Sequence, residues 1–482
     1  MVSPPRPIEP VTRPVTGSIR PPGSKSLTNR AVVLAAMARG ESRLNGVLQS
    51  IDTRVMLDGL SALGFEISEG PGDGEVRIVG TGGRVPATSA NLHLENSGTS
   101  IRFLTTLVTL GTGHYTLDGN SRMRQRPIGD LVEALAQLQV DVTCPAGTGC
   151  PPVSVTSDGL AGGQATLSGS ISSQFLSALL MAAPSAAAPV TLVVDGPLVS
   201  RPYIDMTLAL MNRMGAEVIE NPRGSFTVSP TGYNAIELDI EPDASAASYF
   251  LAAAAITGGH VTVEGLGPEA LQGDVAFGDC LARMGCTVEA TPEGLRVTGG
   301  KLVGIDVDMN AISDTAQTLA VVAAFAEGPT RIRGIAHVRH KETDRVTATV
   351  TELQRLGLTV DEHDDGLTIH PGPLSAGEVQ TYDDHRMAMS FAVAGLASPG
   401  IVIADPDCTA KTYPGFFDDL KRLCENGRCH LPRKRPVRSP SMCFSSGGRQ
   451  ASSPARCSKQ HSHGRTISGR PTGDCPANWS TG

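Results

Sequence analysis

A unit of about 70 residues recurs six times along this chain, and the repeat constrains the fold more than any other feature. In each copy, a leucine-rich helix end is followed by a small or polar residue and a short β-branched run. The copies read LSALGFEI, LAQLQVDVT, LMNRMGAEVI, CLARMGCTVEA, LQRLGLTVDE and LKRLCEN. The repeat predicts a chain built from six copies of one supersecondary motif.

A second series of segments, in the same register, predicts one apolar helix in each unit. These segments begin near Ser26, Thr99, Ser172, Ser245, Asp314 and His385. They are apolar around most of the helical circumference, which is typical of helices buried on all sides. The helix that follows in each unit is amphipathic, and β-branched runs such as VTLVVDG and HVTVEGL predict strands. The predicted class is therefore mixed α/β.

Six such units exceed the usual size of one domain, so two domains of three units are predicted. The natural boundary is Glu241-Pro242, after the third unit. We expect residues 24–241 to form the first domain. Residues 1–23 precede the first unit and could pair with either half; we assign them, with residues 242–427, to the second domain. Two chain crossings between the domains would make a hinge.

Charge is distributed unevenly along the 482 residues, whose formal net charge is −8. The tail, residues 428–482, holds ten of the 40 Lys and Arg residues but only one of the 48 Asp and Glu residues. It has no apolar period, so we predict a disordered basic tail. It is either a tether to nucleic acid or a membrane surface, or an extension read in an altered frame, and we favour the second. The acidic remainder argues against a nucleic-acid-binding protein.

The cysteines and the N-terminus bear on the cellular location. Ten cysteines occur without a C-x-x-C pair, so neither a disulfide framework nor a zinc site is predicted. The proline-rich N-terminus has no apolar core segment, so no signal or transit peptide is expected. The uncharged stretch 176–194 contains Pro184 and Pro189, and it predicts a buried helix and a strand rather than a membrane span. We expect a cytoplasmic protein.

Polar and basic residues gather at the starts of the predicted buried helices. They are Ser24, Lys25, Ser26, Arg30, Asn96, Ser97, Gly98, Thr99, Arg102, Ser172, Ser173, Gln174, Asp314, Asp384, His385 and Arg386. Helix N-termini attract anions, and hydroxyls beside a cation form a phosphate or carboxylate site when several helices meet at one cleft. Simple helix capping explains any one of these starts. Their repeated coincidence with cations favours an anion site.

The loops before the second helices carry further cations. They are Arg122, Arg124, Arg126, Arg201, Lys341, Arg345 and Lys411. Solvated surface charge is the alternative for each one alone, but together they indicate a ligand with several negative charges. Asp314, Glu342 and His385 are candidate acids and bases, with capping or surface exposure as the alternative. These residues predict a two-domain enzyme that closes around small phosphates or carboxylates.

Eight motifs in chain order carry a resemblance to a known family. They read PPGSKSLTNR, ENSGTSIRFL, SRMRQRPIGDLVEAL, SSQFLSALLM, SRPYIDMTL, KETDR, DDHRMAM and DPDCTAKTYPGFF. Over residues 12–424 the chain resembles the 5-enolpyruvylshikimate-3-phosphate synthases of the enolpyruvyl transferase family. The resemblance implies an inside-out α/β fold of two domains. Each domain would hold three βαβαββ units around buried parallel helices.

The resemblance also implies a reaction. The enolpyruvyl group of phosphoenolpyruvate would pass to the 5-hydroxyl of shikimate 3-phosphate, with release of phosphate, in aromatic amino-acid biosynthesis. Each substrate carries a phosphate and a carboxylate, which would account for the many cations. No metal or organic cofactor, no membrane and no nucleic-acid partner is implied, and we expect a monomer.

Site residues are likewise implied by the resemblance. Shikimate 3-phosphate would contact Lys25, Ser26, Arg30, Ser172, Ser173, Gln174, Ser200, Tyr203, Asp314, His337 and Lys341. Phosphoenolpyruvate would contact Lys25, Asn96, Gly98, Arg126, Gln174, Arg345, Arg386 and Lys411. Asp314 is the expected base at the hydroxyl, Glu342 the acid at the methylene carbon, and Lys25 a third catalytic residue.

Two positions deserve separate predictions. His337 stands where some family members have Asn, and its ring can still donate a hydrogen bond to the shikimate phosphate. A residue bulkier than Gly98 would intrude beside phosphoenolpyruvate, where the inhibitor glyphosate binds in this family. We therefore expect a glyphosate-sensitive enzyme.

Two alternatives remain at this point. A related transferase that uses UDP-N-acetylglucosamine as acceptor shares the fold, but it commonly has a mobile-loop cysteine for which Cys144 and Cys150 offer no clear counterpart. The motifs SSQFLSALLM, KETDR and DDHRMAM favour shikimate. A catalytically inactive anion-binding scaffold is the other alternative. The presence of Lys25, Asp314 and Glu342 argues against it.

Overall fold

The structure is a computed structural model that describes residues 4–72, 74–222 and 224–426. All of these residues fall within one compact unit. The predicted basic tail, residues 428–482, lies outside the described residues. Within the described ranges, none of the helices has both the length and the apolar character needed to span a bilayer.

The helices alternate between buried and amphipathic. They are α1 (Lys25–Met37), α2 (Ile51–Ala62), α3 (Gly98–Leu107), α4 (Gly129–Gln137), α5 (Ser173–Ala182), α6 (Arg201–Arg213), α7 (Ala244–Thr257), α8 (Phe277–Arg283), α9 (Ala316–Ala323), α10 (Arg345–Arg355), α11 (His385–Gly395) and α12 (Phe416–Asn426). The odd-numbered helices begin within two residues of the predicted positions, which confirms those predictions. Helices α3, α9 and α11 are buried at every position, as their apolar circumference predicts.

The strands form six small sheets in the described residues. The first sheet contains β14 (Tyr233–Asn234), β15 (Glu237–Asp239), β3 (Ala38–Asn45), β5 (Val76–Thr81) and β4 (Glu66–Glu69). The second contains β6 (Ser89–His93), β7 (Thr112–Asp118), β9 (Val153–Asp158) and β8 (Asp141–Thr143). The third contains β10 (Gly163–Ser168), β11 (Val190–Asp195), β13 (Ser225–Val228) and β12 (Val218–Asn221). The fourth sheet contains β17 (Thr287–Thr291), β18 (Gly294–Thr298), β16 (His260–Glu264) and β2 (Thr16–Ile19). The fifth contains β19 (Asp306–Asp308), β20 (Thr330–Arg333), β22 (Gly366–His370) and β21 (Thr359–His363). The sixth contains β1 (Arg6–Pro7), β24 (Ile401–Ile403) and β23 (Gly377–Val379).

Five of the six units in the described residues follow one connection pattern. The sixth, built from β23, α11, β24 and α12, departs from the expected βαβαββ order: strand β1 runs antiparallel to β24 where the other units have a hairpin. In the second unit the order is β6, α3, β7, α4, β8 and β9, with β6 parallel to β7 and the remaining neighbours antiparallel. The parallel pair needs a crossover helix, and the buried helix α3 supplies it. The third and fifth units repeat this order around α5 and α9.

Strands from distant parts of the chain complete three of the units in the described residues, the sixth of them through β1. In the first unit, β15 runs parallel to β3 although nearly two hundred residues separate them in sequence. In the fourth unit, β2 from the N-terminal segment runs parallel to β16. The described part of the N-terminal segment therefore pairs with elements that follow residue 242.

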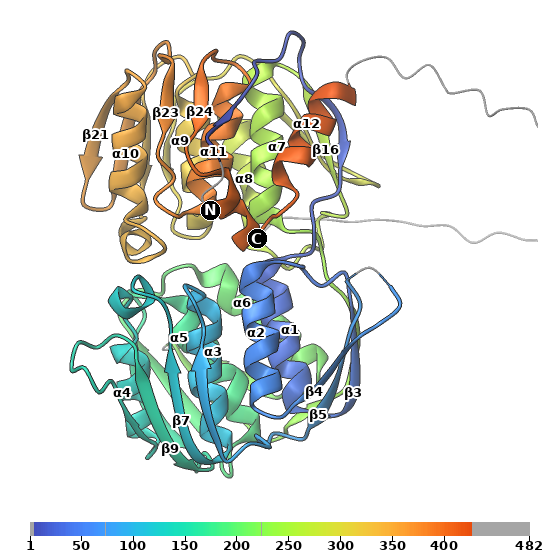
Figure 1. Cartoon of the computed structure of the whole chain (residues 1–482), viewed down its shortest axis with the longest axis vertical. Coiled ribbons are helices and arrows are strands. Elements are labelled where there is room, and N and C mark those ends of the chain that lie inside the picture. Colours follow the sequence, from blue (N-terminus) through green and yellow to red (C-terminus); the bar gives the residue numbers. More distant parts are fainter. Residues whose placement is uncertain (1–3, 73, 223, 427–482) are drawn as a thin grey trace, which may run out of the picture. The chain divides into compact units, whose positions relative to one another are not determined.

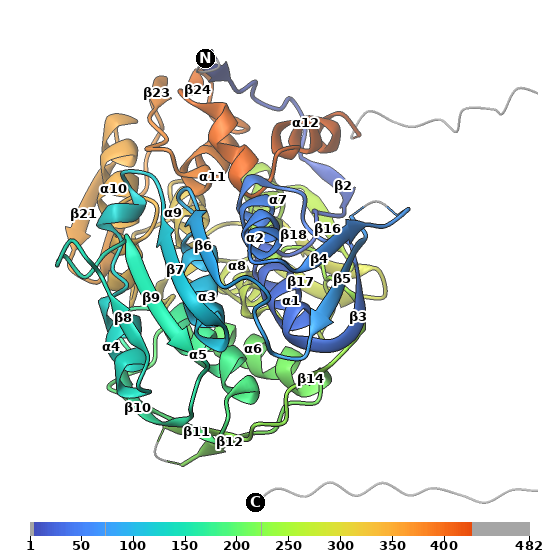
Figure 2. The same cartoon turned by 60° about the horizontal axis from the view of Figure 1, so that its bottom comes forward.

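Two hydrophobic clusters lie in the described residues. One is built between Leu27 and Ile240; the other joins residues 8–19 to residues 244–423. The first half of the protein, residues 24–241, and the second half, residues 4–23 with 242–426, each hold one cluster (Figure 1). In Figure 2, strands β3, β8, β10 and β12 lie around the rim of the first half, with α1, α3 and α5 inside.

The chain passes between the halves at two adjacent points. Gly23 and Pro242 form an isolated antiparallel bridge. The amide of Ser24 donates to the carbonyl of Glu241 at 2.7 Å, and the amide of Asp243 donates to the carbonyl of Pro22 at 2.9 Å. The two crossings are thus hydrogen-bonded to each other at one side of the interface between the halves.

Candidate active site

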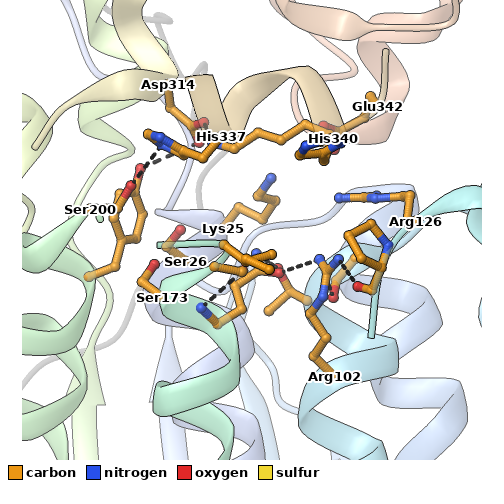
Figure 3. A pocket seen from close by; sticks show the side chains of 18 of the residues that line it. Lys25, Ser26, Arg102, Arg126, Ser173, Ser200, Asp314, His337, His340 and Glu342 are labelled. Atoms are coloured by element: carbon orange, nitrogen blue, oxygen red, sulfur yellow. Dashed lines mark hydrogen bonds and ion pairs between the residues drawn. The ribbon is translucent and has the colours of Figure 1, made fainter. Parts of the chain in front are cut away.

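A pocket lies where the starts of the buried helices of the two halves face each other (Figure 3). It holds about 830 Å³ of space free of protein atoms, part of it open to solvent. Its lining consists of Lys25, Ser26, Arg30, Asp52, Gly98, Thr99, Arg102, Arg126, Pro127, Ile171, Ser172, Ser173, Gln174, Ser200, Tyr203, Asp314, His337, His340, Lys341, Glu342 and Arg345. Asn96, Arg386 and Lys411, which the sequence also predicts, do not line it but contact residues that do.

Helix caps set the first-half wall of the pocket. The hydroxyl of Ser24 accepts from the amide of Leu27, so that Lys25 and Ser26 stand in the first turn of α1. Ser172 caps α5 in the same way and accepts from the amide of Gln174 at 3.3 Å. Both helices therefore direct their N-terminal amides and partial positive charge toward the pocket.

Arg102 ties two of these helices together. Its guanidinium donates to Oε1 of Gln174 at 2.7 Å and to the carbonyl of Pro127 at 3.0 Å. The side-chain amide nitrogen of Gln174 in turn donates to the hydroxyl of Thr99 at 3.2 Å. Burial, with the neighbouring charge of Arg126, lowers the pKa of Arg102 to about 9. Arg102 thus fixes the orientation of the Gln174 amide.

Arg126 lies against the start of α3. One of its terminal nitrogens donates to the main-chain and side-chain oxygens of Asn96, at 3.1 and 3.0 Å. Its Nε is buried and has no hydrogen-bond partner among the described residues. A Cβ on Gly98 would lie 2.7 Å from the Arg126 Cζ and 2.8 Å from a terminal nitrogen of Arg102. Only glycine lets both guanidinium groups pack over this helix start.

Arg30 is fully buried, and most of its donors are used within the protein. Its guanidinium bonds to the Thr207 hydroxyl at 2.7 Å, to the Ser177 hydroxyl at 3.2 Å, and to the carbonyls of Ser26 and Tyr203. Burial lowers the pKa of Arg30 to about 10. Arg30 therefore holds Ser26 and Tyr203 in place besides lining the pocket.

Asp314 is the centre of the second-half wall. Its carboxylate lies 2.5 Å from Lys341 Nζ, 3.2 Å from Arg345 Nη1 and 2.7 Å from Arg386 Nη2. Burial acts to raise the pKa of Asp314, but the charges of these three cations outweigh it and hold the pKa well below the ordinary value. The carboxylate is ionised in the free protein.

Glu342 forms a second buried anion beside it. Its carboxylate lies 2.9 Å from Arg345 Nη2 and 3.3 Å from Lys411 Nζ. Burial raises its pKa, while Lys411, Arg345 and Arg126 lower it, and the result is a pKa well below the ordinary value. Lys411 also donates to the carbonyl of Asn96 at 2.9 Å, a hydrogen bond that joins the two halves.

Ser200 and His337 meet across the halves. Nε2 of His337 lies 3.2 Å from the Ser200 hydroxyl and 2.9 Å from the Ser313 hydroxyl. Burial, with the nearby charge of Lys341, lowers the pKa of His337 to about 3, so the ring is neutral at physiological pH. Ser200 has a φ of 54°, in the left-handed region, and its amide donates to Oδ1 of Asn310 at 3.0 Å. The contacts with the second half help to hold this strained residue.

Tyr203 reaches two carboxylates of the second half. Its hydroxyl donates to Oδ2 of Asp274 at 3.0 Å and lies 3.4 Å from Oδ2 of Asp314. Ser245 also donates to Asp274. Burial and the charge of Asp314 raise the pKa of Asp274 to about 6. Asp274 lies in the short 3-10 helix Gly273–Ala276. Sequence reasoning missed it, because a single acid in the string LQGDVAF carries no sign of burial.

Arg122, Arg124 and Arg201, all predicted to face an anion, do not line the pocket. Arg122 instead donates to the main-chain carbonyls of Lys341 and Glu342, and the other two form surface ion pairs. Arg124 is exposed and forms an ion pair with Asp118. Arg201 is half-buried at the surface, and it pairs with Asp205 at 2.7 Å and with Glu220 at 2.6 Å. For these two the prediction of a ligand-binding role is wrong, and the alternative of solvated surface charge is correct.

His385, a candidate proton carrier in the sequence, is placed differently from the acids. Its ring is fully buried, it does not line the pocket, and neither ring nitrogen has a hydrogen-bond partner among the described residues. Burial and the charge of Arg386 lower its pKa well below the ordinary value, so the ring is neutral.

Some lining residues were not predicted. Asp52, whose Oδ2 lies 3.7 Å from Lys25 Nζ, gave no signal in the sequence. Pro127, Ile171 and His340 also line the pocket, and each is adjacent in sequence to a predicted residue. No group of three His, Cys, Asp or Glu side chains suited to a metal ion occurs in the part of the chain that the structure describes.

Comparisons of the sequence with known proteins all give the same family. A model of the family described as EPSP synthase (3-phosphoshikimate 1-carboxyvinyltransferase) matches residues 10–420. The chain is 47% identical over 417 residues to a 3-phosphoshikimate 1-carboxyvinyltransferase of Nostoc punctiforme, covering 86% of this chain and 98% of that protein. It is 47% identical over 438 residues to the chloroplastic enzyme of that name from Arabidopsis thaliana, covering 86% and 84%.

Solved structures agree. An EPSP synthase from Acinetobacter baumannii superposes with a TM-score of 0.73 at 28% identity, covering 87% of this chain and 98% of that one. The enolpyruvyl transferase NikO from Streptomyces tendae superposes with a TM-score of 0.69 at 19% identity, over 88% and 98% of the two chains, which shows a likeness of fold.

Proposed function

The chain belongs to the EPSP synthase family, and we propose that the pocket between its halves is where the reaction of this family takes place. The protein is an enzyme, a 3-phosphoshikimate 1-carboxyvinyltransferase of the shikimate pathway. It transfers the enolpyruvyl group of phosphoenolpyruvate to the 5-hydroxyl of shikimate 3-phosphate and releases phosphate.

The convergence of cations from both halves on one pocket carries the assignment of the site. These cations are Lys25, Arg126, Lys341, Arg345, Arg386 and Lys411. The protein as a whole has a net charge of −8, so such a concentration of cations needs a reason. Two substrates with a phosphate and a carboxylate each supply four anionic groups that cations can bind. The buried Nε atoms of Arg126 and Arg386, without partners among the described residues, are donors suited to such anions.

Shikimate 3-phosphate is assigned to the side lined by α1, α5 and α6. The residues proposed to contact it are Lys25, Ser26, Arg30, Ser172, Ser173, Gln174, Ser200, Tyr203, Asp314, His337 and Lys341. Hydroxyls, helix N-terminal amides and a lysine at α1 and α5 form the type of site that binds phosphate. Neutral His337 would serve by hydrogen bonding and not by charge, because its pKa lies near 3.

Phosphoenolpyruvate is assigned to the side lined by α3 and the segments around Glu342 and Lys411. The residues proposed to contact it are Lys25, Asn96, Gly98, Gln174, Arg126, Arg345, Arg386 and Lys411. Arginine side chains suit this ligand because their planar donors pair with carboxylate and phosphate oxygens in a bidentate manner.

Asp314 is proposed as the base that takes the proton of the 5-hydroxyl. In the free protein its three cation partners make it a weak base. When substrate phosphates and carboxylates attract Lys341 and Arg386, those cations stabilise the Asp314 carboxylate less, and its pKa rises toward the range in which it accepts a proton. Substrate binding would thus activate the base.

Glu342 is proposed as the acid that protonates the methylene carbon of phosphoenolpyruvate. It is ionised in the free protein, so it needs a proton source. Solvent supplies that proton, because Lys411, whose Nζ lies 3.3 Å from the carboxylate, holds Glu342 in its ionised form. The negative charges of phosphoenolpyruvate favour the protonated form of Glu342, and in this form Glu342 can act as the general acid. Lys25 and Lys411 are further proposed to stabilise the departing phosphate.

We also propose that the two halves move as domains, residues 24–241 against residues 1–23 with 242–427, about the paired crossings at Gly23 and Pro242. A monomer is proposed, because a single chain supplies every residue of the pocket. We propose the cytoplasm as its location; the buried free thiols of Cys280 and Cys286 suit a reducing compartment.

Phosphate release from phosphoenolpyruvate tests the assignment. The wild type should release phosphate with shikimate 3-phosphate, and not when this acceptor is omitted or replaced by UDP-N-acetylglucosamine. Lys411→Met should abolish release, whereas Lys421→Met, which removes an exposed lysine of α12, should not. Release without the acceptor would contradict the reaction, and a fully active Lys411→Met protein would contradict the site.

A further inference from the structure

Arg122 joins the two halves from a position outside the pocket lining. It lies in the loop between β7 and α4, at the start of the short 3-10 helix Met123–Gln125. The amides of Arg122 and Met123 both donate to Oδ1 of Asn120, at 3.1 and 3.2 Å, and one terminal nitrogen of the guanidinium donates to Oε1 of Gln125 at 3.3 Å. The first half therefore holds both the backbone and the side chain of Arg122.

The other nitrogens of this guanidinium contact the second half. Nε donates to the carbonyl of Glu342 at 2.9 Å, and Nη2 donates to the carbonyl of Lys341 at 2.8 Å. One rigid planar group thus binds two consecutive main-chain oxygens. The side chain is partly buried at this interface.

The segment that Arg122 holds contains two residues of the active site. Lys341 and Glu342 lie between the 3-10 helix Ala336–His340 and α10, outside regular secondary structure. Their side chains contact Asp314 and Lys411, respectively. Because no helix or sheet includes these two residues, contacts from other elements must help to fix their positions.

Charge alone does not explain the placement of Arg122. Burial lowers its pKa, and so does the like charge of neighbouring Arg126, so the positive charge is unfavourable there. Arginine suits this position because its planar guanidinium donates to two carbonyls at once, those of Glu342 and Lys341.

We infer that Arg122 is a positioning residue, which sets the Lys341–Glu342 segment when the two halves come together. The inference rests on the proposed function, because it assigns to this contact the alignment of the residues that bind and protonate substrate. Arg122 acts through the main chain and touches neither substrate. A displacement of about 1 Å in such groups lowers turnover by about 10²-fold.

Steady-state kinetics of Arg122→Ala test the inference, with Arg124→Ala as the matched control. Arg124 lies in the same loop but is exposed, and its ion pair is with Asp118 of the first half. We expect Arg122→Ala to lower kcat by about 10- to 100-fold. The KM for shikimate 3-phosphate should change much less, because most of its proposed contacts lie in the first half. Arg124→Ala should retain the wild-type kcat.

Two further measurements separate positioning from charge and from stability. Arg122→Lys retains the charge but not the planar guanidinium, so its kcat should stay near that of Arg122→Ala. Guanidinium ion at low, non-denaturing concentration should restore part of the kcat of Arg122→Ala and leave Arg124→Ala unchanged. A wild-type kcat in Arg122→Ala or Arg122→Lys would overturn the inference. The inference would also be overturned if guanidinium failed to restore the kcat of Arg122→Ala and the fall in kcat went with a lower midpoint of urea unfolding. An inactive wild type would instead contradict the proposed function.

Discussion

Tyr382 donates its hydroxyl hydrogen to Oε1 of Glu352, with 2.6 Å between the two oxygens. The Glu352 side chain is fully buried in α10, and its other oxygen accepts from the amide of Gln380 at 3.0 Å. Tyr382 and Asp383 have φ values of 56° and 54°, in the left-handed region. The turn they form leads into Asp384, which caps α11. A buried carboxylate thus holds the strained turn that sets the start of an active-site helix.

Glu352→Ala should therefore destabilise the protein. It leaves the Tyr382 hydroxyl and the Gln380 amide without their acceptor, which corresponds to a loss of about 2–4 kcal/mol in the free energy of unfolding. Urea titration at neutral pH measures this loss. Thr351→Ala, a change one residue away at a half-buried position whose hydroxyl donates only within the same helix, to the carbonyl of Thr347, should alter stability by less than about 0.5 kcal/mol. Equal stability of the two variants would show that the turn does not depend on Glu352.

Asp314→Asn should separate catalysis from anion binding. Without the base, kcat should fall by about 10²- to 10⁴-fold. Inorganic phosphate should bind more tightly than to the wild type, because Lys341 and Arg386 lose their neutralising partner. Calorimetric titration with phosphate measures this change, and Asp418→Asn on the exposed face of α12 is the control. Weaker phosphate binding in Asp314→Asn would contradict the electrostatic account.

Gly98→Ala should weaken phosphoenolpyruvate binding. The new methyl group would displace the guanidinium of Arg126 or Arg102, and overpacking of this kind costs about 1–3 kcal/mol. That cost corresponds to a rise of roughly 5- to 150-fold in the KM for phosphoenolpyruvate.

Glyphosate tests the same position. The wild type should lose activity at millimolar glyphosate, and Gly98→Ala should lose less. Gly267→Ala is the control, because a methyl group there meets nothing within 4 Å. Undiminished wild-type activity at this concentration would reject the expected sensitivity.

Asp274 should make stability depend on pH in a defined direction. Its pKa is about 6 in the folded protein, above the ordinary value of 3.8. Between these two values the folded protein binds the proton more tightly than the unfolded chain, so this group's contribution to stability falls as pH rises. The loss of stability that comes from ionising Asp274 in the folded protein is therefore complete above about pH 6 and absent below about pH 4.

Asp274→Asn removes this penalty. The difference in unfolding free energy between the variant and the wild type should grow from about pH 4 to about pH 6 and then stay constant. Urea titrations across this range measure the difference. Asp279→Asn, an exposed change on α8, should show no such rise. A difference that shrinks with pH would contradict the raised pKa of Asp274.

The sequence predicted the elements that depend on local pattern. The apolar circumference of segments such as the one beginning near Thr99 gave the position of each buried helix to within two residues. Cations at helix starts and in loops predicted an anion site, and Lys25, Lys341 and Arg345 do line one pocket. The helix positions were predictable because periodicity and capping are properties of short segments; the binding of anions in this pocket stays a prediction.

Pairings between distant residues were not predictable in this way. Arg124 and Arg126 lie two positions apart in one loop, yet one forms a surface ion pair and the other lies buried against Asn96. Glu352 looks like an exposed helical acid in the string TELQRLG. It does pair with Arg355, three residues away. Its partners Gln380 and Tyr382, however, lie about 30 residues further along the chain, and only the folded arrangement brings them to it.

Strand β2 is synthesised before β16, its partner about 240 residues later in the chain. At roughly 5–20 residues per second, synthesis of the intervening chain takes roughly 10–50 s. Residues 24–241 can fold in that interval, while β2 has no sheet to join. A strand that is made before the first half therefore pairs only after it, and its unpaired edge stays open to other chains until then.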